Sequence, residues 1–279
     1  MNMNSICYLN GEFVSLADAK VSVLDRGFIF GEGLYEVMTA VECNLLHYKN
    51  HFKRLRDGAK DMQLDIPFSD SELYRLIKKV IAHNNFPCCS VYLQFTKGPA
   101  PRDHFYPSEY VPTLFIMASP IEIPGRLKFV DAILLKDIRW QKCNVKSTSL
   151  YANTWAKTMA KTSGGEEAIF EREGILTEGA TSNLFLVCEN KVFTPEENEY
   201  ILPGVTRELV LEILRRKNIK YEETAISTDS LWKADELLLT STTKGVVAVK
   251  AVNGKTIGDG KNFNLGVEIF QAMKALSFS

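Results

Sequence analysis

A proline–glycine pair near the middle of the chain restricts most strongly how this sequence can fold. Pro124 and Gly125 lie within 121–127, between two stretches with the composition of strands. Proline lacks the amide hydrogen that a sheet requires and glycine favours turns, so this segment is expected to be a linker. We therefore expect an N-terminal domain at 1–120, a linker at 121–127 and a C-terminal domain at 128–279.

Local sequence patterns predict an α+β chain. Asn10-Gly11 and Asn253-Gly254 each follow a short strand-like stretch, as in tight β-hairpins. Ser69-Asp70-Ser71-Glu72 is a capping-box pattern ahead of an amphipathic helix. The spacing of apolar residues, together with glycine and proline at the ends, predicts further helices. They are expected at about 51–63, at about 148–162, directly after Pro203-Gly204, at about 229–234 and at about 264–277. The remaining apolar stretches, such as 90–96, 113–118 and 184–187, are expected to be strands.

The composition excludes several classes of protein. The 279 residues carry a formal net charge of −1, which argues against a dedicated nucleic-acid or membrane-surface binder. The apolar stretches are far shorter than the roughly 20 residues of a membrane span, and the first residues do not resemble a signal peptide. The six cysteines suit neither a disulfide framework nor a metal clip, so we expect reduced thiols in a cytoplasmic protein.

His47 and His51 are four residues apart, a spacing that can hold a metal ion on one face of a helix. The sequence offers no third ligand nearby, and His47 is expected to precede the helix that His51 begins. We interpret both as polar residues at a helix start and expect no metal site.

Three features could bind a phosphate group. The stretch 202–208 combines a Pro-Gly turn with Thr206 at a predicted helix start, where backbone amides bind anions; an ordinary threonine-capped helix is the alternative. The stretch 240–243 places four hydroxyls at a strand end, although threonine is also common in strands. Arg54, on an early helix, is either a cation for the phosphate or a solvated surface residue.

Two further stretches could contact a ligand. The run 26–36 holds three glycines among aromatic residues, matches no nucleotide-binding pattern, and suggests a backbone that passes close to another surface. Tyr35, in this run, could meet a ligand or pack in a core. Arg102 and His104 lie two residues apart in a proline-rich loop, where they could bind a carboxylate or simply be exposed polar residues.

Taken in order, these stretches closely resemble the fold type IV (class IV) pyridoxal-phosphate aminotransferases. That family includes branched-chain aminotransferases, D-amino acid aminotransferases and 4-amino-4-deoxychorismate lyases. The resemblance extends from Asn10-Gly11 to Gly254-Lys255, and its most specific parts are 26–36, Lys146, 177–185, 202–207 and 240–243. It implies a smaller α/β N-terminal domain, a C-terminal pseudo-barrel domain, and a homodimer with a shared active site.

The resemblance also implies which residues bind pyridoxal 5′-phosphate. Lys146, which on its own would be taken for a surface lysine, matches the residue that forms the Schiff base and acts as general base. Glu178 matches the carboxylate partner of the pyridine nitrogen. The other implied cofactor contacts are Arg54, Thr181, Val205, Thr206, Ser241 and Thr242.

Within the family, the chain looks most like D-amino acid aminotransferase, on the evidence of the stretch 137–140, Cys143 and the Arg102-x-His104 loop. In such enzymes the residues matching Tyr35, Arg102 and His104 bind the substrate carboxylate, the last two from the neighbouring subunit. The implied reaction is ping-pong transamination of a D-amino acid such as D-alanine with a 2-oxo acid, 2-oxoglutarate or pyruvate. A branched-chain L-amino acid aminotransferase or a 4-amino-4-deoxychorismate lyase remains the alternative on the same scaffold.

Overall fold

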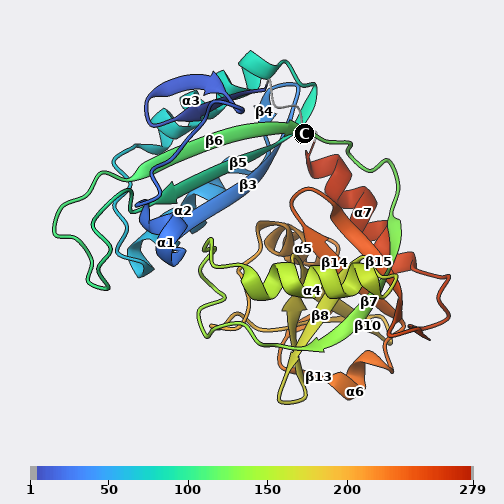
Figure 1. The fold of residues 1–279 in the computed structure, drawn as a ribbon. Coiled ribbons are helices and arrows are strands. Elements are labelled where there is room, and N and C mark those ends of the chain that lie inside the picture. The colour runs from blue at the N-terminus through green and yellow to red at the C-terminus, as the bar shows by residue number, and fades with distance from the viewer. Residues whose placement is uncertain (1–4, 278–279) are drawn as a thin grey trace. The chain divides into compact units, whose positions relative to one another are not determined.

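The computed structural model describes residues 5–277, and the contacts within the chain divide it into two compact units (Figure 1). The first unit comprises Met1–Ile123 with Val145–Ser149, and the second comprises Pro124–Asn144 with Leu150–Ser279. The change between units near Pro124 falls inside the segment expected to be a linker. The short segment at 145–149 was expected in the C-terminal domain, but it counts with the first unit because Ser147 pairs with Leu34 there.

The first unit contains a six-stranded antiparallel sheet. In spatial order its strands are β2 (Glu12–Ser15), β1 (Ile6–Leu9), β6 (Thr113–Pro120), β5 (Cys88–Thr96), β3 (Gly33–Val41) and β4 (Asn44–Leu45). The predicted hairpin is confirmed, since the two residues between β1 and β2, Asn10 and Gly11, both have positive φ. Along β5 and β6, buried residues alternate with half-buried ones, so the sheet has a core face and a more open face.

Two amphipathic helices cover the core face of this sheet. They are α2 (Tyr48–Asp61) and α3 (Asp70–Asn84), and their buried residues share one apolar cluster with β3, β5 and β6. The predicted capping box at the start of α3 is confirmed, with the Ser69 side chain accepting from the Glu72 amide and the Glu72 carboxylate accepting from the Ser69 amide. The helix predicted from 51 begins earlier, at Tyr48, because His47 in the left-handed conformation precedes it.

A short helix, α1 (Arg26–Phe30), lies in the glycine-rich run and was not predicted as a helix. Asp25 caps it by accepting a hydrogen bond from the Gly27 amide at 2.8 Å. The expected close approach of the backbone is confirmed, since a Cβ at Gly27 would lie 2.3 Å from a side-chain carbon of Thr96. Close packing against β5 therefore explains why the run is rich in glycine.

The second unit contains a ten-stranded mixed sheet that curls into a half-barrel (Figure 1). In spatial order its strands are β12 (Tyr221–Glu223), β11 (Lys191–Thr194), β10 (Asn183–Cys188), β14 (Glu236–Ser241), β15 (Gly245–Val252), β7 (Lys128–Lys136), β8 (Glu167–Arg172), β9 (Ile175–Gly179) and β13 (Ile226–Ser227), with β16 (Lys255–Thr256) paired to β15. Strand β7 runs parallel to both β8 and β15, and β11 runs parallel to β12, while the other pairs are antiparallel. The predicted hairpin at Asn253-Gly254 is confirmed between β15 and β16.

The helices of this unit pack against the sheet. They are α4 (Tyr151–Thr162), α5 (Val205–Arg216), α6 (Thr228–Leu231) and α7 (Asn264–Ser277). Helices α5 and α7 share an apolar cluster with β10, β14 and β15, whereas α4 packs on β8 through small alanines against Phe170. The predicted α+β fold with two domains is confirmed. None of the helices in the described range is long and apolar enough to cross a membrane.

Candidate active site

Lys146 lies on a short extended segment that pairs with the start of β3. Its carbonyl accepts a hydrogen bond from the Tyr35 amide at 3.0 Å. Its side chain is half-buried, and Nζ lies 4.3 Å from the centre of the Tyr35 ring. An aromatic face attracts a cation at this distance, so the structure brings these two predicted site residues together.

Tyr35 projects from the more open face of the sheet rather than into its core. Its ring stacks on that of Tyr92, with the centres 5.5 Å apart, and the Tyr92 hydroxyl donates to Gln94 Oε1 at 2.6 Å. Burial, followed by the nearby Tyr35, raises the pKa of Tyr92 to about 12. Tyr92 therefore remains a neutral phenol, and its stacked ring restricts how far Tyr35 can move.

Arg54 is anchored to a buried carboxylate on β3. Glu36 is completely buried and accepts hydrogen bonds from Arg54 Nε at 2.8 Å and Arg54 Nη2 at 2.7 Å. Burial alone would raise the pKa of Glu36, but the charge and hydrogen bonds of Arg54, helped by His51, lower it to about 2. The side chain of Arg54 is only 9% exposed, so the alternative of a solvated surface arginine is wrong.

His51 completes this buried cluster; it lies in the first turn of α2, but its burial was not expected. Because α2 begins at Tyr48, His51 lies inside the helix, where it is 1% exposed. Its Nδ1 lies 2.7 Å from Glu36 Oε2. Burial lowers the pKa of His51, so a neutral imidazole donates its Nδ1 hydrogen to the carboxylate. In the part of the chain described, no group of three His, Cys, Asp or Glu residues is arranged to hold a metal ion.

Arg102 and His104 are exposed, and both lie beside the same aromatic ring. The guanidinium carbon of Arg102 is 5.6 Å from the centre of the Phe30 ring, and the ring centre of His104 is 5.7 Å from it. The structure therefore brings together the two loop residues predicted to bind a carboxylate. Phe30 was not singled out from the sequence as their neighbour.

In the second unit, Glu178 is a buried carboxylate whose two oxygens both accept hydrogen bonds. Arg139 Nη1 forms an ion pair with its Oε1, while the Asn183 side-chain amide and the Leu202 backbone amide each donate to its Oε2 at 3.1 Å. These contacts fix the orientation of the carboxylate. A fixed carboxylate is what a pyridinium nitrogen requires as its partner.

Sequence reasoning missed the role of Arg139. Its Nε and Nη2 bind the two oxygens of Asp137 at 3.0 Å and 2.9 Å, so the guanidinium bridges Asp137 and Glu178. Burial would lower the pKa of Arg139, but the charge of Glu178 and the hydrogen bond to Asp137 raise it overall. From the sequence, the stretch 137–140 contributed only to the family resemblance. Arg139 and Glu178 are 39 residues apart, and no sequence pattern predicts a contact over that separation.

The start of α5 lies beside Asn183, which also contacts Glu178. Gly204 is the N-cap residue of the helix and has no side chain to cap it, so the first backbone amides of α5 are suited to bind an anion. A Cβ at Gly204 would lie 1.9 Å from Asn183 Oδ1, so only glycine permits this approach. Asn183 Nδ2 also donates to the Leu202 carbonyl at 2.8 Å. Asn183 was not predicted as a site residue, although it lies in the stretch 177–185.

A group of hydroxyls lies at the end of β14, next to Asn183. Thr240 pairs with Asn183 in the sheet, and its buried hydroxyl lacks a hydrogen-bond partner within 5–277. Ser241 is the last residue of β14, and Thr242 follows it. An unsatisfied hydroxyl and an uncapped helix start are groups that a phosphate would satisfy, so this donor set fits pyridoxal 5′-phosphate.

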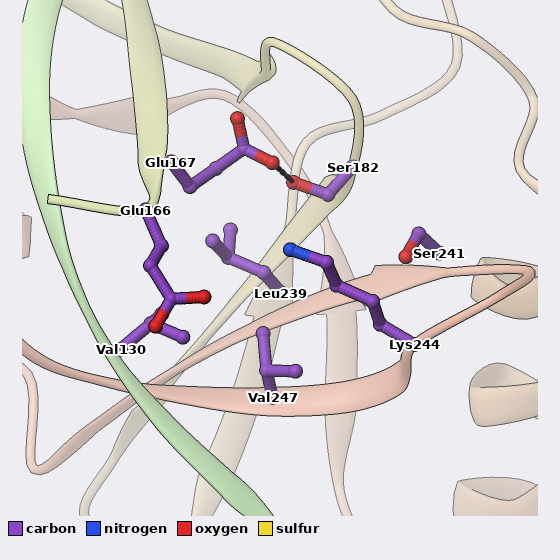
Figure 2. A pocket seen from close by; sticks show the side chains of 8 residues that line it. All are labelled: Val130, Glu166, Glu167, Ser182, Leu239, Ser241, Lys244 and Val247. Carbon is purple, nitrogen blue, oxygen red and sulfur yellow. Dashed lines mark hydrogen bonds between the residues drawn. The ribbon is translucent and has the colours of Figure 1, made fainter. Parts of the chain in front are cut away.

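Thr181 contacts a different acidic residue. Its hydroxyl donates to Glu167 Oε2 at 2.7 Å, and the Ser182 hydroxyl donates to the same atom at 3.3 Å. Glu167 and Ser182 line a pocket together with Ser241, and Lys244 extends into it from the turn between β14 and β15 (Figure 2). The predicted contact of Thr181 with the cofactor stays a prediction.

Comparisons with known proteins show the family of this chain. The sequence model of the family described as Amino-transferase class IV matches residues 33–252. D-alanine aminotransferase of Staphylococcus epidermidis is 35% identical over 91% of this chain and 91% of its own length. D-alanine aminotransferase of Bacillus licheniformis is 36% identical over 90% of this chain and 89% of its own length.

Solved structures show the same fold. The branched-chain amino acid aminotransferase of Escherichia coli superimposes with a TM-score of 0.90 at 25% identity, covering 98% of this chain and 95% of that one. A putative 4-amino-4-deoxychorismate lyase of Legionella pneumophila superimposes with a TM-score of 0.84 at 22% identity, covering 92% of this chain and 95% of that one. This chain is an enzyme that belongs to the class IV aminotransferases.

Proposed function

We propose that this enzyme transaminates D-amino acids such as D-alanine, with 2-oxoglutarate or pyruvate as the acceptor. The observation that carries the proposal is the pairing of Arg102 with His104 beside the Phe30 ring. A guanidinium fork next to an imidazole suits the α-carboxylate of an amino acid. The relatives named D-alanine aminotransferase, 35% identical over 91% of the chain, support the same substrate class.

Pyridoxal 5′-phosphate is the proposed cofactor. Lys146 would bind it covalently, and Glu178 would contact its pyridine nitrogen. The remaining proposed contacts are with the phosphate or the ring, namely Arg54, Thr181, Val205, Thr206, Ser241 and Thr242. The uncapped start of α5 and the unsatisfied Thr240 hydroxyl support the assignment of the phosphate to the group around Thr206.

When bound, pyridoxal 5′-phosphate supplies a conjugated ring that absorbs the electron pair left when a proton leaves the substrate Cα. Lys146, once its amine is released, would take that proton and return it at the other end of the conjugated system. Tyr35, Arg102 and His104 would hold the substrate carboxylate, and so fix which face of the amino acid meets Lys146. Water would then release the deaminated substrate as the first 2-oxo acid, and the retained amino group would pass to a second 2-oxo acid in a ping-pong sequence.

A homodimer with a shared site is part of this proposal. Large apolar side chains are exposed on and beside the Arg102 loop, with Val23 at 71%, Phe28 at 70% and Phe105 at 82%. The two segments that carry them are tied together, since the Ala100 amide donates to the Leu24 carbonyl at 3.2 Å. A cluster of exposed apolar side chains is typical of a protein–protein interface, and a second copy of this chain would cover it. Six free thiols suit the reducing cytoplasm, where we propose the enzyme works.

A branched-chain L-amino acid aminotransferase is the second candidate, because the Escherichia coli enzyme of that name has a TM-score of 0.90 to this chain. The same residues would bind the cofactor, and only the carboxylate contacts would differ. A 4-amino-4-deoxychorismate lyase on this scaffold would also keep Lys146 and Glu178.

The visible absorption spectrum of the purified holoenzyme tests the proposal. The band of the bound cofactor should disappear on addition of D-alanine alone and return when pyruvate or 2-oxoglutarate is added. A response to L-leucine and not to D-alanine would assign the enzyme to the branched-chain group. A bound cofactor that responds to neither amino acid would favour the lyase.

A further inference from the structure

The loop that carries Arg102 and His104 is attached to a buried arginine. Arg26 is 1% exposed, and its Nε and Nη2 each donate to the carboxylate of Glu32 at 2.7 Å. Its remaining terminal nitrogen, Nη1, donates to the backbone carbonyl of Asp103 at 2.8 Å. Asp103 stands between Arg102 and His104, so one buried guanidinium fixes the backbone at the centre of the pair.

Two further contacts hold the same loop. The Phe30 ring lies 4.7 Å from the Arg26 guanidinium carbon and is also the ring beside Arg102 and His104. Lys97 is 1% exposed, and its Nζ lies 3.0 Å from the centre of the Tyr106 ring, at the far end of the loop. The loop is therefore held at its middle by a hydrogen bond and at two other points by cation–aromatic contacts.

We propose that Arg26 is a positioning residue for carboxylate recognition, which acts by holding the Asp103 carbonyl so that Arg102 and His104 are already in place when substrate arrives. The inference rests on the proposed function, in which these two residues bind the substrate carboxylate. Without this anchor, part of the binding free energy of each substrate molecule would be spent on ordering the loop. Arg26 suits the task because its planar fork binds Glu32 at two points and still has a donor for the carbonyl.

Substitution Arg26→Lys keeps the charge but cannot keep both the two-point pair with Glu32 and the bond to Asp103. The KM for D-alanine should rise roughly tenfold, and kcat should change much less, since Arg26 touches no reacting atom. Propionate is the sharper probe, because it has the carboxylate and lacks the amine. Its inhibition constant should rise by the same factor as the KM.

The matched control is Arg56→Lys in the same unit. Arg56 also joins a helix to a loop, through Asp70 at 2.9 Å and the Ile66 and Phe68 carbonyls, but that loop carries no proposed site residue. Arg56→Lys should leave both the KM and the propionate inhibition constant unchanged. Phe30→Leu, which removes the ring but keeps an apolar side chain, should raise the propionate constant in the same direction as Arg26→Lys.

Circular dichroism and the cofactor band establish whether each variant is folded and loaded. A folded Arg26→Lys with an unchanged propionate constant overturns the proposal, as does an equal rise in Arg56→Lys. If Arg26→Lys does not fold, Glu32→Gln, which keeps Arg26 but weakens the two-point pair that orients it, decides in the same way. If the wild-type enzyme does not use D-alanine, the proposed substrate is wrong, but propionate inhibition against the amino acid that it does use still tests the role of Arg26.

Discussion

Glu36 and Arg54 form a two-point ion pair that joins β3 to α2, with donor–acceptor distances of 2.8 Å and 2.7 Å. The preceding residue, Tyr35, points to the opposite face of the strand and contacts Lys146. One dipeptide of β3 therefore positions two of the proposed site residues, an arginine on its buried side and a lysine on its open side.

Replacing Arg54 with lysine should weaken binding of pyridoxal 5′-phosphate. Lysine cannot reproduce the two-point contact with Glu36, so its ammonium would not be held where the guanidinium is. Loss of one charged hydrogen bond to the phosphate should raise the Kd by roughly tenfold or more. Equilibrium dialysis of the apoenzyme measures this, with pyridoxal as the control ligand. Equal weakening for pyridoxal, which has no phosphate, would contradict a phosphate role for Arg54.

The pH dependence of stability should report the buried carboxylate. The pKa of Glu36 falls from an ordinary 4.5 to about 2 on folding, so the folded state favours the charged form. A depressed pKa contributes stability above the unfolded pKa, and this contribution is lost as the pH falls from about 4.5 to about 2. Across that window the wild-type protein should lose about 3 kcal/mol that Glu36→Gln does not lose. Urea denaturation of both proteins at several pH values measures it, and parallel pH profiles would contradict the assignment.

Much of this fold follows from local rules that the sequence displays. The capping box at Ser69 and the Asn-Gly hairpins at 10–11 and 253–254 depend on contacts within a few residues, so each could be predicted. Helix α1 could not, because its five residues are too few to show a period, and its glycines respond to packing against Thr96.

The family resemblance predicted individual residues of the site, but not the residues that hold them in place. The partners of those residues depend on contacts between distant segments. Arg139 reaches Glu178 across 39 residues, and Arg26 reaches Asp103 across 77. The burial of His51 could not be predicted, because an error of three residues in the start of α2 moves a side chain from the exposed to the buried side of a helix.

Glu178→Gln should lower kcat on the order of a hundredfold, because an amide does not provide the charge that a protonated ring nitrogen requires. Arg139→Lys should give a smaller loss, roughly tenfold, since one of the donors that hold the Glu178 carboxylate is displaced. Single-turnover spectra with D-alanine separate this chemical effect from substrate binding. The matched control is Arg172→Lys, since Arg172 lies 3.4 Å from Asp137 and donates to the Arg139 carbonyl, yet neither contact involves Glu178. If kcat falls as much in Arg172→Lys as in Arg139→Lys, the ion-pair network around Asp137 affects activity only through the stability of the protein.

Lys146→Ala should abolish transamination, with a fall in kcat of roughly a thousandfold or more. The protein should still fold, because the hydrogen bond that joins this segment to β3 comes from the Lys146 backbone carbonyl and survives the substitution. Mass spectrometry after borohydride treatment provides a second readout. The wild-type chain should retain the cofactor covalently on the peptide that contains Lys146, and the variant should not. Lys142→Ala, an exposed lysine four residues earlier, is the control that should change neither result.

Gly204→Ala tests whether the start of α5 and Asn183 act as one unit. The added methyl group would lie 1.9 Å from Asn183 Oδ1, so either the helix start or the Asn183 side chain must move. Such overpacking typically costs about 1–3 kcal/mol of stability. If Asn183 moves, it releases Glu178 and the Leu202 carbonyl together, so both the Kd for pyridoxal 5′-phosphate and kcat should worsen. The control is Gly125→Ala, where an added Cβ would meet open space. It should leave the stability, the Kd for the cofactor and kcat unchanged. A Gly204→Ala enzyme that loses stability but keeps its affinity for the cofactor would show that α5 does not bind the phosphate.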